Sequence, residues 1–310
     1  MKYSLKITLL LIVMFLVAQL IGLYVAQAYL PEQHVIVNVT TNVSQVVTTY
    51  DLPYGFNPPQ DITPQVSVFS IIAGILIAVL LVFLIMRLNA AIVLKIWFFV
   101  VVAIGLGLAL NALVKDFFNA AAIIAIVIAI PLAYIKIFQR NIVMHNLTEL
   151  LIYPGIASVF IPLLTIPAAI GLLILISVYD IYAVWHAGFM QKMAKYQIEK
   201  LRIFSGFFIP YLSDKDRALF KKLKDSKSQK KVKVNVAILG GGDVVFPIIL
   251  AGVVLRTLGI LPALAISFFA TIALGVLLYY AEKGKFYPAM PFISAGCFIG
   301  LGAAYLIAYA

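Results

Sequence analysis

The sequence contains little charge for its size. Only 11% of its 310 residues are Asp, Glu, Lys or Arg, whereas 64% are hydrophobic, and the mean hydropathy is +1.09. A water-soluble domain carries about 25% charged residues, so this chain lacks the polar surface that would cover a globule of its length. The scarcity of charge excludes an ordinary soluble protein and indicates one that uses the lipid bilayer as its solvent.

Residues that form metal sites and disulfides are also scarce. The single cysteine, Cys297, excludes an internal disulfide and a cysteine-based zinc site. The three histidines, His34, His145 and His186, are far apart and form no H-E-x-x-H motif. Neither a G-x-G-x-x-G nor a Walker pattern is present, so a phosphate-binding loop is unsupported. We therefore expect no metal and no other cofactor.

Long apolar runs make up most of the chain. A membrane-spanning helix needs about 20 mostly apolar residues. Nine runs near this length occur, at 7–30, 66–86, 91–113, 118–135, 142–164, 166–187, 236–257, 261–281 and 289–309. The first also resembles a signal peptide, with an A-x-A pattern at Ala26-Gln27-Ala28, but it exceeds the usual apolar core of a signal. The sequence predicts an all-α multi-pass protein of the cell membrane with nine transmembrane helices.

The basic residues predict the orientation of these helices. The net charge is +11, and most Lys and Arg lie together between residues 192 and 233. In a membrane protein such a cluster follows from the positive-inside rule, so we expect the lipid bilayer and no nucleic acid as a partner. With a cytoplasmic N-terminus, nine crossings place nearly all basic residues on the cytoplasmic side. The C-terminus should then lie outside.

The runs divide the chain into three parts. These are residues 1-187 with six helices and an external loop at 31-64, residues 188-235 as a basic cytoplasmic loop, and residues 236-310 with three helices. In the external loop, valines recur at every second position, 35, 37 and 39, and predict a short hairpin. Asn38 and Asn42 begin N-glycosylation patterns there. In the basic loop, 189–203 has the spacing of an interfacial helix, and 231–236 alternates as a strand does.

Three acidic residues fall inside the predicted spans: Glu149, Asp180 and Asp243. An ionisable group in hydrocarbon costs on the order of several kcal/mol, so each is a functional hypothesis. Glu149 lies near the cytoplasmic start of its helix, within reach of interfacial water, and we interpret it as structural. Asp180 precedes the end of 166–187 by about eight residues, and Asp243 follows the start of 236–257 by about eight. At 1.5 Å per residue both lie roughly 12 Å deep, so we expect their carboxyl groups to face each other.

A facing pair of carboxyl groups has a defined chemistry. Two such groups in a low-dielectric site cannot both ionise, so the pair holds a shared proton. One member can act as a general base towards water while the other protonates the carbonyl oxygen of a peptide bond. Because the pair titrates as a unit, the sequence assigns neither role. The glycines Gly240, Gly241 and Gly242 weaken the helix before Asp243 and permit close approach of another backbone, although glycine also serves helix packing.

These residues resemble the signatures of a known family. Tyr179-Asp180 and Gly240-Gly241-Gly242-Asp243 are similar to the Y-D and G-x-G-D motifs of presenilins and signal peptide peptidases, the intramembrane aspartyl proteases. The family's third motif, Pro-Ala-Leu, has two candidate matches. Leu261-Pro262-Ala263-Leu264 matches by its letters, whereas Pro288-Ala289-Met290 opens the ninth helix, as the family's motif does. We choose 288–290, because position in the architecture constrains geometry more than one side chain. The short loops are more similar to those of a prokaryotic or archaeal member.

The resemblance implies proteolysis in or near transmembrane segments of other membrane proteins. It implies that Asp180 and Asp243 are catalytic and that Tyr179 and the glycines up to Gly242 shape the site. It further implies that Pro288, Ala289 and Met290 lie beside the pair and hold substrate. The main rival is a proton-coupled transporter or channel that uses the same aspartates, and a non-catalytic scaffold is a third reading. Oligomeric state and accessory subunits stay open.

The alternating segment before Asp243 suggests how substrate binds. A substrate helix hides its peptide bonds in its own hydrogen bonds, so cleavage requires local unwinding. An edge formed by Val232, Val234 and Val236 can pair with the unwound segment by strand addition. The alternative is an ordinary tail next to the membrane. Proline at position 234 should remove a backbone donor from this edge and reduce proteolysis.

Overall fold

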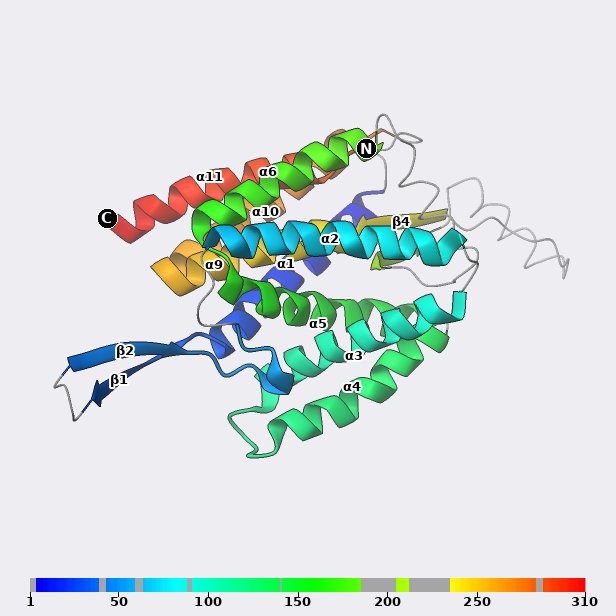
Figure 1. Cartoon of the computed structure of the whole chain (residues 1–310). Helices are drawn as coiled ribbons and strands as arrows, with labels where there is room; N and C mark the ends of the chain where they lie inside the picture. Colours follow the sequence, from blue (N-terminus) through cyan, green and yellow to red (C-terminus); the bar gives the residue numbers. More distant parts are fainter. Residues whose placement is uncertain are drawn as a thin grey trace, which may run out of the picture.

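A bundle of helices with two small hairpins makes up the structure, which is a computed structural model (Figure 1). It describes residues 4–38, 43–58, 64–87, 91–139, 141–184, 205–211, 235–282 and 287–309. The helices in these ranges are α1 (Leu5–Ala28), α2 (Pro64–Arg87), α3 (Ala91–Val114), α4 (Ala121–Phe138), α5 (Ile142–Phe160), α6 (Ile166–Tyr182), α9 (Gly241–Leu258), α10 (Ile260–Tyr280) and α11 (Met290–Tyr309). The strands are β1 (Glu32–Asn38), β2 (Val43–Thr49), β3 (Gly206–Tyr211) and β4 (Asn235–Gly240).

Each predicted apolar run contains one of these helices. Within the described ranges, seven helices are long and apolar enough to cross a membrane, and α6 is a shorter apolar helix of 17 residues. Large hydrophobic side chains such as Phe69, Phe117 and Leu306 are exposed on the outside of the bundle. A helix that is apolar all round suits lipid as its surroundings. The chain is therefore a multi-pass membrane protein.

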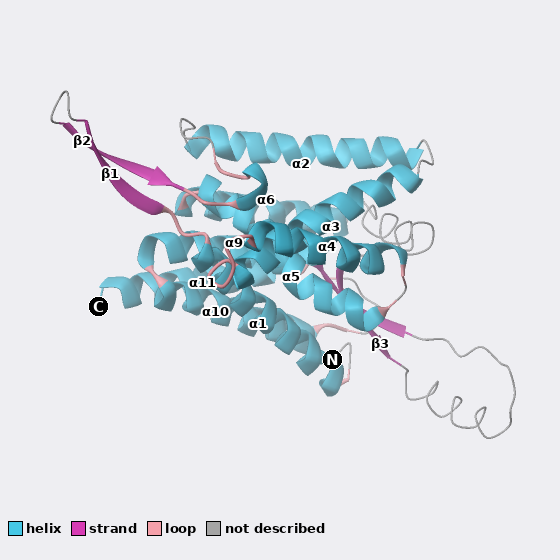
Figure 2. Cartoon of the chain, turned by 90° about the horizontal axis from the view of Figure 1, so that it is seen from below, coloured by secondary structure: helices cyan, strands magenta, loops and turns pink. Residues whose placement is uncertain are grey.

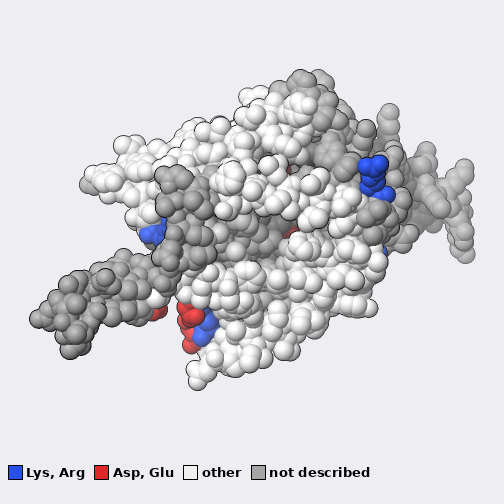
Figure 3. Space-filling model, viewed as in Figure 1, with Lys and Arg blue, Asp and Glu red and all other residues white. Residues whose placement is uncertain are grey.

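The two ends of the bundle differ in what they carry. The N-terminus lies at the same end as β4, whereas the C-terminus lies at the other end, with the β1–β2 hairpin (Figures 1 and 2). In Figure 3 most of the Lys, Arg, Asp and Glu atoms drawn in colour lie towards the two ends, and the described surface between them is mostly white, with small patches of acidic atoms. This distribution fits a bundle whose middle lies in hydrocarbon.

The predicted hairpin in the external loop is confirmed. β1 and β2 pair antiparallel, with Val35 opposite Val46 and Val37 opposite Ser44. Residues 39–42 lie outside the described ranges, and so does the acceptor Asn42. The predicted interfacial helix at 189–203 also lies outside them.

The predicted start of the helix that carries Asp243 is wrong. Residues 235–240 form β4, and α9 begins only at Gly241. Two observations explain this: burial alternates along 236–239, as it does in a strand with one covered face, and the glycines that follow are poor helix formers. Asp243 therefore lies in the first turn of α9 rather than eight residues inside a helix. Asp180 lies in the last turn of α6 (Ile166–Tyr182); Ala183 and Val184 continue as π-helix, and residues 185–187 lie outside the described ranges.

Helix α5 is the central element of the bundle. It packs against α1, α3, α4, α9 and β3. At its crossing with α3, a Cβ added to Gly155 would lie 1.8 Å from the backbone oxygen of Gly105. Only glycine permits two helix backbones to come this close. The start of α5, on the opposite side of its midpoint from this crossing, bonds to β3.

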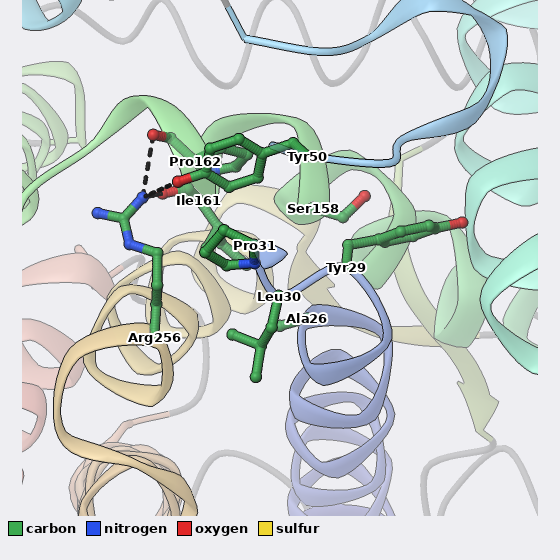
Figure 4. Close-up of a pocket in the computed structure, with 9 residues that line it drawn as sticks. All are labelled: Ala26, Tyr29, Leu30, Pro31, Tyr50, Ser158, Ile161, Pro162 and Arg256. Atoms are coloured by element: carbon green, nitrogen blue, oxygen red, sulfur yellow. Dashed lines mark hydrogen bonds between the residues drawn. The ribbon is translucent and has the colours of Figure 1, made fainter. Parts of the chain in front are cut away.

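Arg256, in the last turn of α9, fixes the break between α5 and α6 (Figure 4). Its guanidinium donates to the carbonyl oxygens of Ile161 at 3.1 Å and Pro162 at 3.0 Å. It also donates to Leu164 O at 2.5 Å and to the Tyr50 hydroxyl at 3.3 Å. Carbonyl groups at the end of a helix have no partner within it. Arg256 therefore pairs polar groups that would otherwise be left unbonded inside the bundle.

Replacing Arg256 by methionine should destabilise the fold. Methionine keeps the apolar length but leaves the carbonyl groups without a donor, and hydrogen bonds to a charged group contribute about 1.5–3 kcal/mol each. We expect R256M to lower the free energy of unfolding by about 3 kcal/mol, measured as a lower Tm in detergent. The control is R87M, because Arg87 is exposed at the end of α2. Equal melting of the two variants would contradict this role.

Candidate functional site

Asp180 and Asp243 lie on neighbouring helices at the end of the bundle that carries β3 and β4. Asp180 belongs to the last turn of α6 and Asp243 to the first turn of α9, and these two helices pack against each other. Their carboxyl groups are close enough to interact electrostatically. The Asp180 side chain is buried, with 7% of its surface exposed. The structure thus brings together the two acidic residues that the sequence singled out.

The start of α11 holds the Asp180 carboxyl group. The backbone N–H of Met290, the first residue of α11, donates to Asp180 Oδ2 at 3.1 Å, and the backbone of Ala289 also bonds to Asp180. The first N–H groups of a helix have no partner within it and favour negative charge. The structure therefore places the segment 288–290 beside Asp180. Pro262, in the first turn of α10, lies a helix length away from the start of α11.

The Asp243 carboxyl group bonds within its own turn. Gly240 is the N-cap residue of α9, and its backbone N–H donates to Asp243. A side chain three residues after the N-cap that bonds back to the N-cap N–H is one half of a capping box. A Cβ added to Gly240 would lie 3.1 Å from Asp243 Oδ2. Gly240 therefore sets where this carboxyl group sits.

The three glycines have different surroundings. A Cβ at Gly241 would lie 2.8 Å from the ring of Tyr153 and 3.0 Å from Ser205 Oγ. A Cβ at Gly242 would meet only Phe246, at 3.6 Å, which is ordinary contact. Sequence reasoning treated the glycines as one group, but the described packing requires glycine most strictly at Gly241.

Tyr179, which the sequence suggested as a residue that shapes the site, lies on the surface of α6. Its side chain is 52% exposed, although it is next to Asp180 in the chain. Another residue of α6 makes a hydrogen bond to a neighbouring helix: Ser177 Oγ lies 2.9 Å from Ser294 Oγ of α11. This bond holds α6 against α11 one turn from Asp180. Sequence reasoning missed both serines, which resemble ordinary helix-packing residues.

Gln19 is a further residue that sequence reasoning missed. Its side chain is fully buried, and its Nε2 donates to the backbone oxygen of Val244 at 3.1 Å. The bond joins α1 to the first turn of α9, directly after Asp243. A single amide in the middle of an apolar run was the signal that could have revealed it.

The predicted edge residues are only partly described. Val236 belongs to β4 and lies opposite Pro210 of β3 in an antiparallel pair. Val232 and Val234 lie outside the described residues. In the ranges that the structure describes, no group of three His, Cys, Asp or Glu residues could hold a metal ion.

Comparisons with known proteins agree on one family. A family model described as signal-peptide peptidase, presenilin aspartyl protease matches residues 32–310. A structure of a presenilin family intramembrane aspartate protease in space group C222 has a TM-score of 0.58 and 19% identity, covering 97% of this chain and 99% of that chain. A second, in space group P2, has a TM-score of 0.56 and 19% identity, covering 96% of each chain. No curated protein matches the chain significantly.

Alanine should be tolerated at Gly242 but not at Gly241. At Gly241 the new methyl group would push α9 away from Tyr153, whereas at Gly242 alanine gains about 0.5–1 kcal/mol of helix stability without a clash. We expect G241A to lower the Tm in detergent and G242A to keep or raise it. A G242A protein that melts well below G241A would contradict this packing. Loss of activity in a stable G242A protein would indicate that substrate approaches there.

Proposed function

Because the chain belongs to the signal-peptide peptidase and presenilin family of aspartyl proteases, we propose that Asp180 and Asp243 are its catalytic pair. The chain is an intramembrane aspartyl protease, an aspartic endopeptidase that acts on membrane proteins in a lipid bilayer. The family gives no support to the rival reading as a transporter. The observation that carries the proposal is the electrostatic interaction between the two carboxyl groups, whose helices α6 and α9 pack against each other.

The geometry supports hydrolysis by an activated water. Helix N-termini stabilise negative charge. Here the first N–H of α11 donates to Asp180, and Asp243 lies in the first turn of α9. Their closeness disfavours two negative charges, so the pair holds one proton. The ionised carboxylate takes a proton from a water molecule, and the oxygen of that water attacks the carbonyl carbon of the peptide bond. The neutral carboxylic acid protonates the carbonyl oxygen. A proton then passes to the amide nitrogen as the C–N bond breaks, giving a carboxylic acid and an amine.

The proposal includes nine membrane crossings, with the N-terminus cytoplasmic and the C-terminus outside. The opposite positions of the two termini support an odd number of crossings (Figure 1). The chain then has three parts: residues 1–187 with the helices up to α6, residues 188–235 as the basic loop, and residues 236–310 with the helices from α9 onward. The substrates are transmembrane segments of other proteins, and the cell membrane is the proposed location.

The free edge of β4 supports strand addition by substrate. In an antiparallel ladder the backbone groups of alternate residues point towards the partner strand and away from it. Pro210 has no N–H, and the N–H and C=O of Phe208 bond to α5 rather than to β4. The alternation therefore turns the backbone groups of their partners, Val236 and Ile238, away from β3.

This free edge leads directly to the carboxyl pair. The next outward residue along β4 is Gly240, whose N–H donates to Asp243. Among the described residues, none bonds to the outward backbone groups of Val236 and Ile238. A segment of unwound substrate that pairs there would run towards Asp243. The proposed edge therefore continues past residue 236, the last residue of the predicted strand segment, and comes closer to Asp243.

Replacing either aspartate by asparagine should abolish proteolysis. Positioned acid–base groups contribute about 10²–10⁴-fold to rate, so D180N and D243N should each lose at least about 10²-fold of fragment production from a membrane substrate. The control is D116N, because Asp116 is exposed in a loop outside the helices. The measurement is mass spectrometry of fragments made by purified protein. Fragments at the wild-type rate from D243N would overturn the assignment.

Proline at Val236 should reduce cleavage while the fold persists. Its ring removes an outward N–H but leaves the bonds between β3 and β4, and one lost hydrogen bond corresponds to about 0.5–1.5 kcal/mol, or up to about tenfold in rate. We expect V236P to cut more slowly with an unchanged Tm, and V236A, which keeps the N–H, to cut like wild type. V234P should behave like V236P if the strand continues to that residue. Normal cleavage by V236P would end the edge hypothesis.

A further inference from the structure

The first turns of α5 carry polar side chains that bond to the backbone of β3. Asn146 Oδ1 accepts from the Phe208 N–H at 2.9 Å, and Asn146 Nδ2 donates to the Phe208 oxygen at 2.9 Å. One side chain therefore makes both bonds that a residue of a neighbouring strand would make. Asn146 caps the outer edge of β3 as a further strand would.

Gly206 is another residue of β3 whose backbone groups point away from β4, and α5 holds it in the same way. The Gly206 N–H donates to Glu149 Oε1 at 3.3 Å, and the Gly206 oxygen lies 2.8 Å from His145 Nε2. Lys136 Nζ of α4 lies 2.5 Å from Glu149 Oε1 and 3.3 Å from His145 Nδ1. A carbonyl oxygen only accepts and an ammonium only donates, so His145 carries its proton on Nε2. Every group in this cluster has a partner.

The third outward residue of β3, Pro210, has no N–H to offer. All three outward positions in the described part of β3 thus lack a free backbone donor: two are bonded to α5, and one is proline. The two edges of the hairpin differ accordingly. The edge of β3 is closed by α5, while that of β4 is open next to Asp243. Capping an edge is how proteins prevent unwanted strand pairing.

We propose that His145, Asn146 and Glu149, with Lys136, close the edge of β3, so that a substrate strand adds only to β4 and in one register. This inference rests on the proposed function. Asn146 is a positioning residue, because it acts on the substrate through β3 and β4. The cluster includes a buried pair of charges, with Lys136 and Glu149 only 3% and 1% exposed. Burying an ion pair adds little stability on balance, which favours a role in specifying one arrangement.

Contacts on the inner face carry the position of β3 to the catalytic pair. Phe207 is fully buried, and its ring packs edge-on against Tyr153 of α5 at 5.7 Å between ring centres. Tyr153 in turn abuts Gly241, two residues before Asp243. Phe207 also pairs with Leu239 of β4. A shift of β3 on α5 therefore displaces both the open edge and the first turn of α9.

The experiment compares three variants: N146L, N146D and the control L147A. Leucine is similar in size to asparagine but cannot form the side-chain hydrogen bonds to Phe208. Leu147 follows Asn146 on α5 and is 52% exposed. Hydrogen exchange, followed by mass spectrometry on the full chain in detergent, reports protection of segment 205–211. Mass spectrometry of fragments from a model transmembrane substrate reports the cleavage positions, and initial rates give kcat and KM separately.

We expect N146L to increase exchange at 205–211 by about tenfold, since the Phe208 N–H and oxygen lose their partners on α5. Exchange in α9 beyond its first turn should stay unchanged. Cleavage should spread over several adjacent peptide bonds, with lower kcat. N146D keeps the acceptor for the Phe208 N–H and should fall between N146L and wild type. L147A should match wild type in both measurements.

Two results would overturn the proposal. One is wild-type exchange at 205–211 in N146L, and the other is faster exchange with an unchanged pattern of cleavage positions. If N146L unfolds, N146D decides between the same outcomes. Fragments that persist in D180N would instead refute the proposed function, while the exchange comparison still reports whether α5 closes the edge of β3.

Discussion

Backbone polar groups in a membrane protein must find their partners inside the protein, because hydrocarbon offers none. Helices meet this requirement within one segment, but a two-stranded hairpin leaves two edges unpaired. In this chain the edge of β3 is bonded by side chains of α5, and the edge of β4 ends at the carboxyl group of Asp243. In the described part of the β3–β4 hairpin, the unbonded outward groups therefore lie on β4, where we propose that a substrate backbone finds its partners. The rest of the site follows from this arrangement.

A protease in the membrane has to unwind the segment that it cuts. Each peptide group released from a substrate helix loses a hydrogen bond and needs another, at a cost of about 1–3 kcal/mol if none is found. The outward backbone groups of Val236 and Ile238 can supply these bonds within one short stretch. The same stretch ends at Gly240, which holds Asp243 in place. In the proposed mechanism, one strand therefore both binds the unwound chain and leads to the carboxyl group that acts on its peptide bond.

The sequence predicted the elements whose physical signals are strong. Twenty apolar residues in a row have few alternatives to a spanning helix, and a buried acid such as Asp180 or Asp243 is too costly to be incidental. The alternation in the external loop was enough for the β1–β2 hairpin. The start of α9 was placed wrongly, because hydropathy does not separate an apolar strand such as β4 from the first turns of a helix.

Other parts of the site depend on contacts that no local pattern encodes. β3 contains Pro210 and two adjacent phenylalanines, Phe207 and Phe208, so its alternation is weak, and only its pairing with β4 makes it a strand. The difference between Gly241 and Gly242 arises from where Tyr153 lies. Asn146 stands near the start of a helix, where asparagine is common for other reasons.

Glu149 shows how the meaning of a residue changes once its neighbours are known. The sequence placed it near interfacial water, but the structure buries it against Lys136 and the backbone of Gly206. Its charge is balanced by Lys136, and its remaining capacity to accept a hydrogen bond is used by the strand. A carboxylate that only paired with lysine could be replaced by apolar residues at little cost in stability. A carboxylate that also accepts a hydrogen bond from a strand edge holds that edge in position. An apolar substitute would leave the Gly206 N–H unbonded and the edge of β3 open.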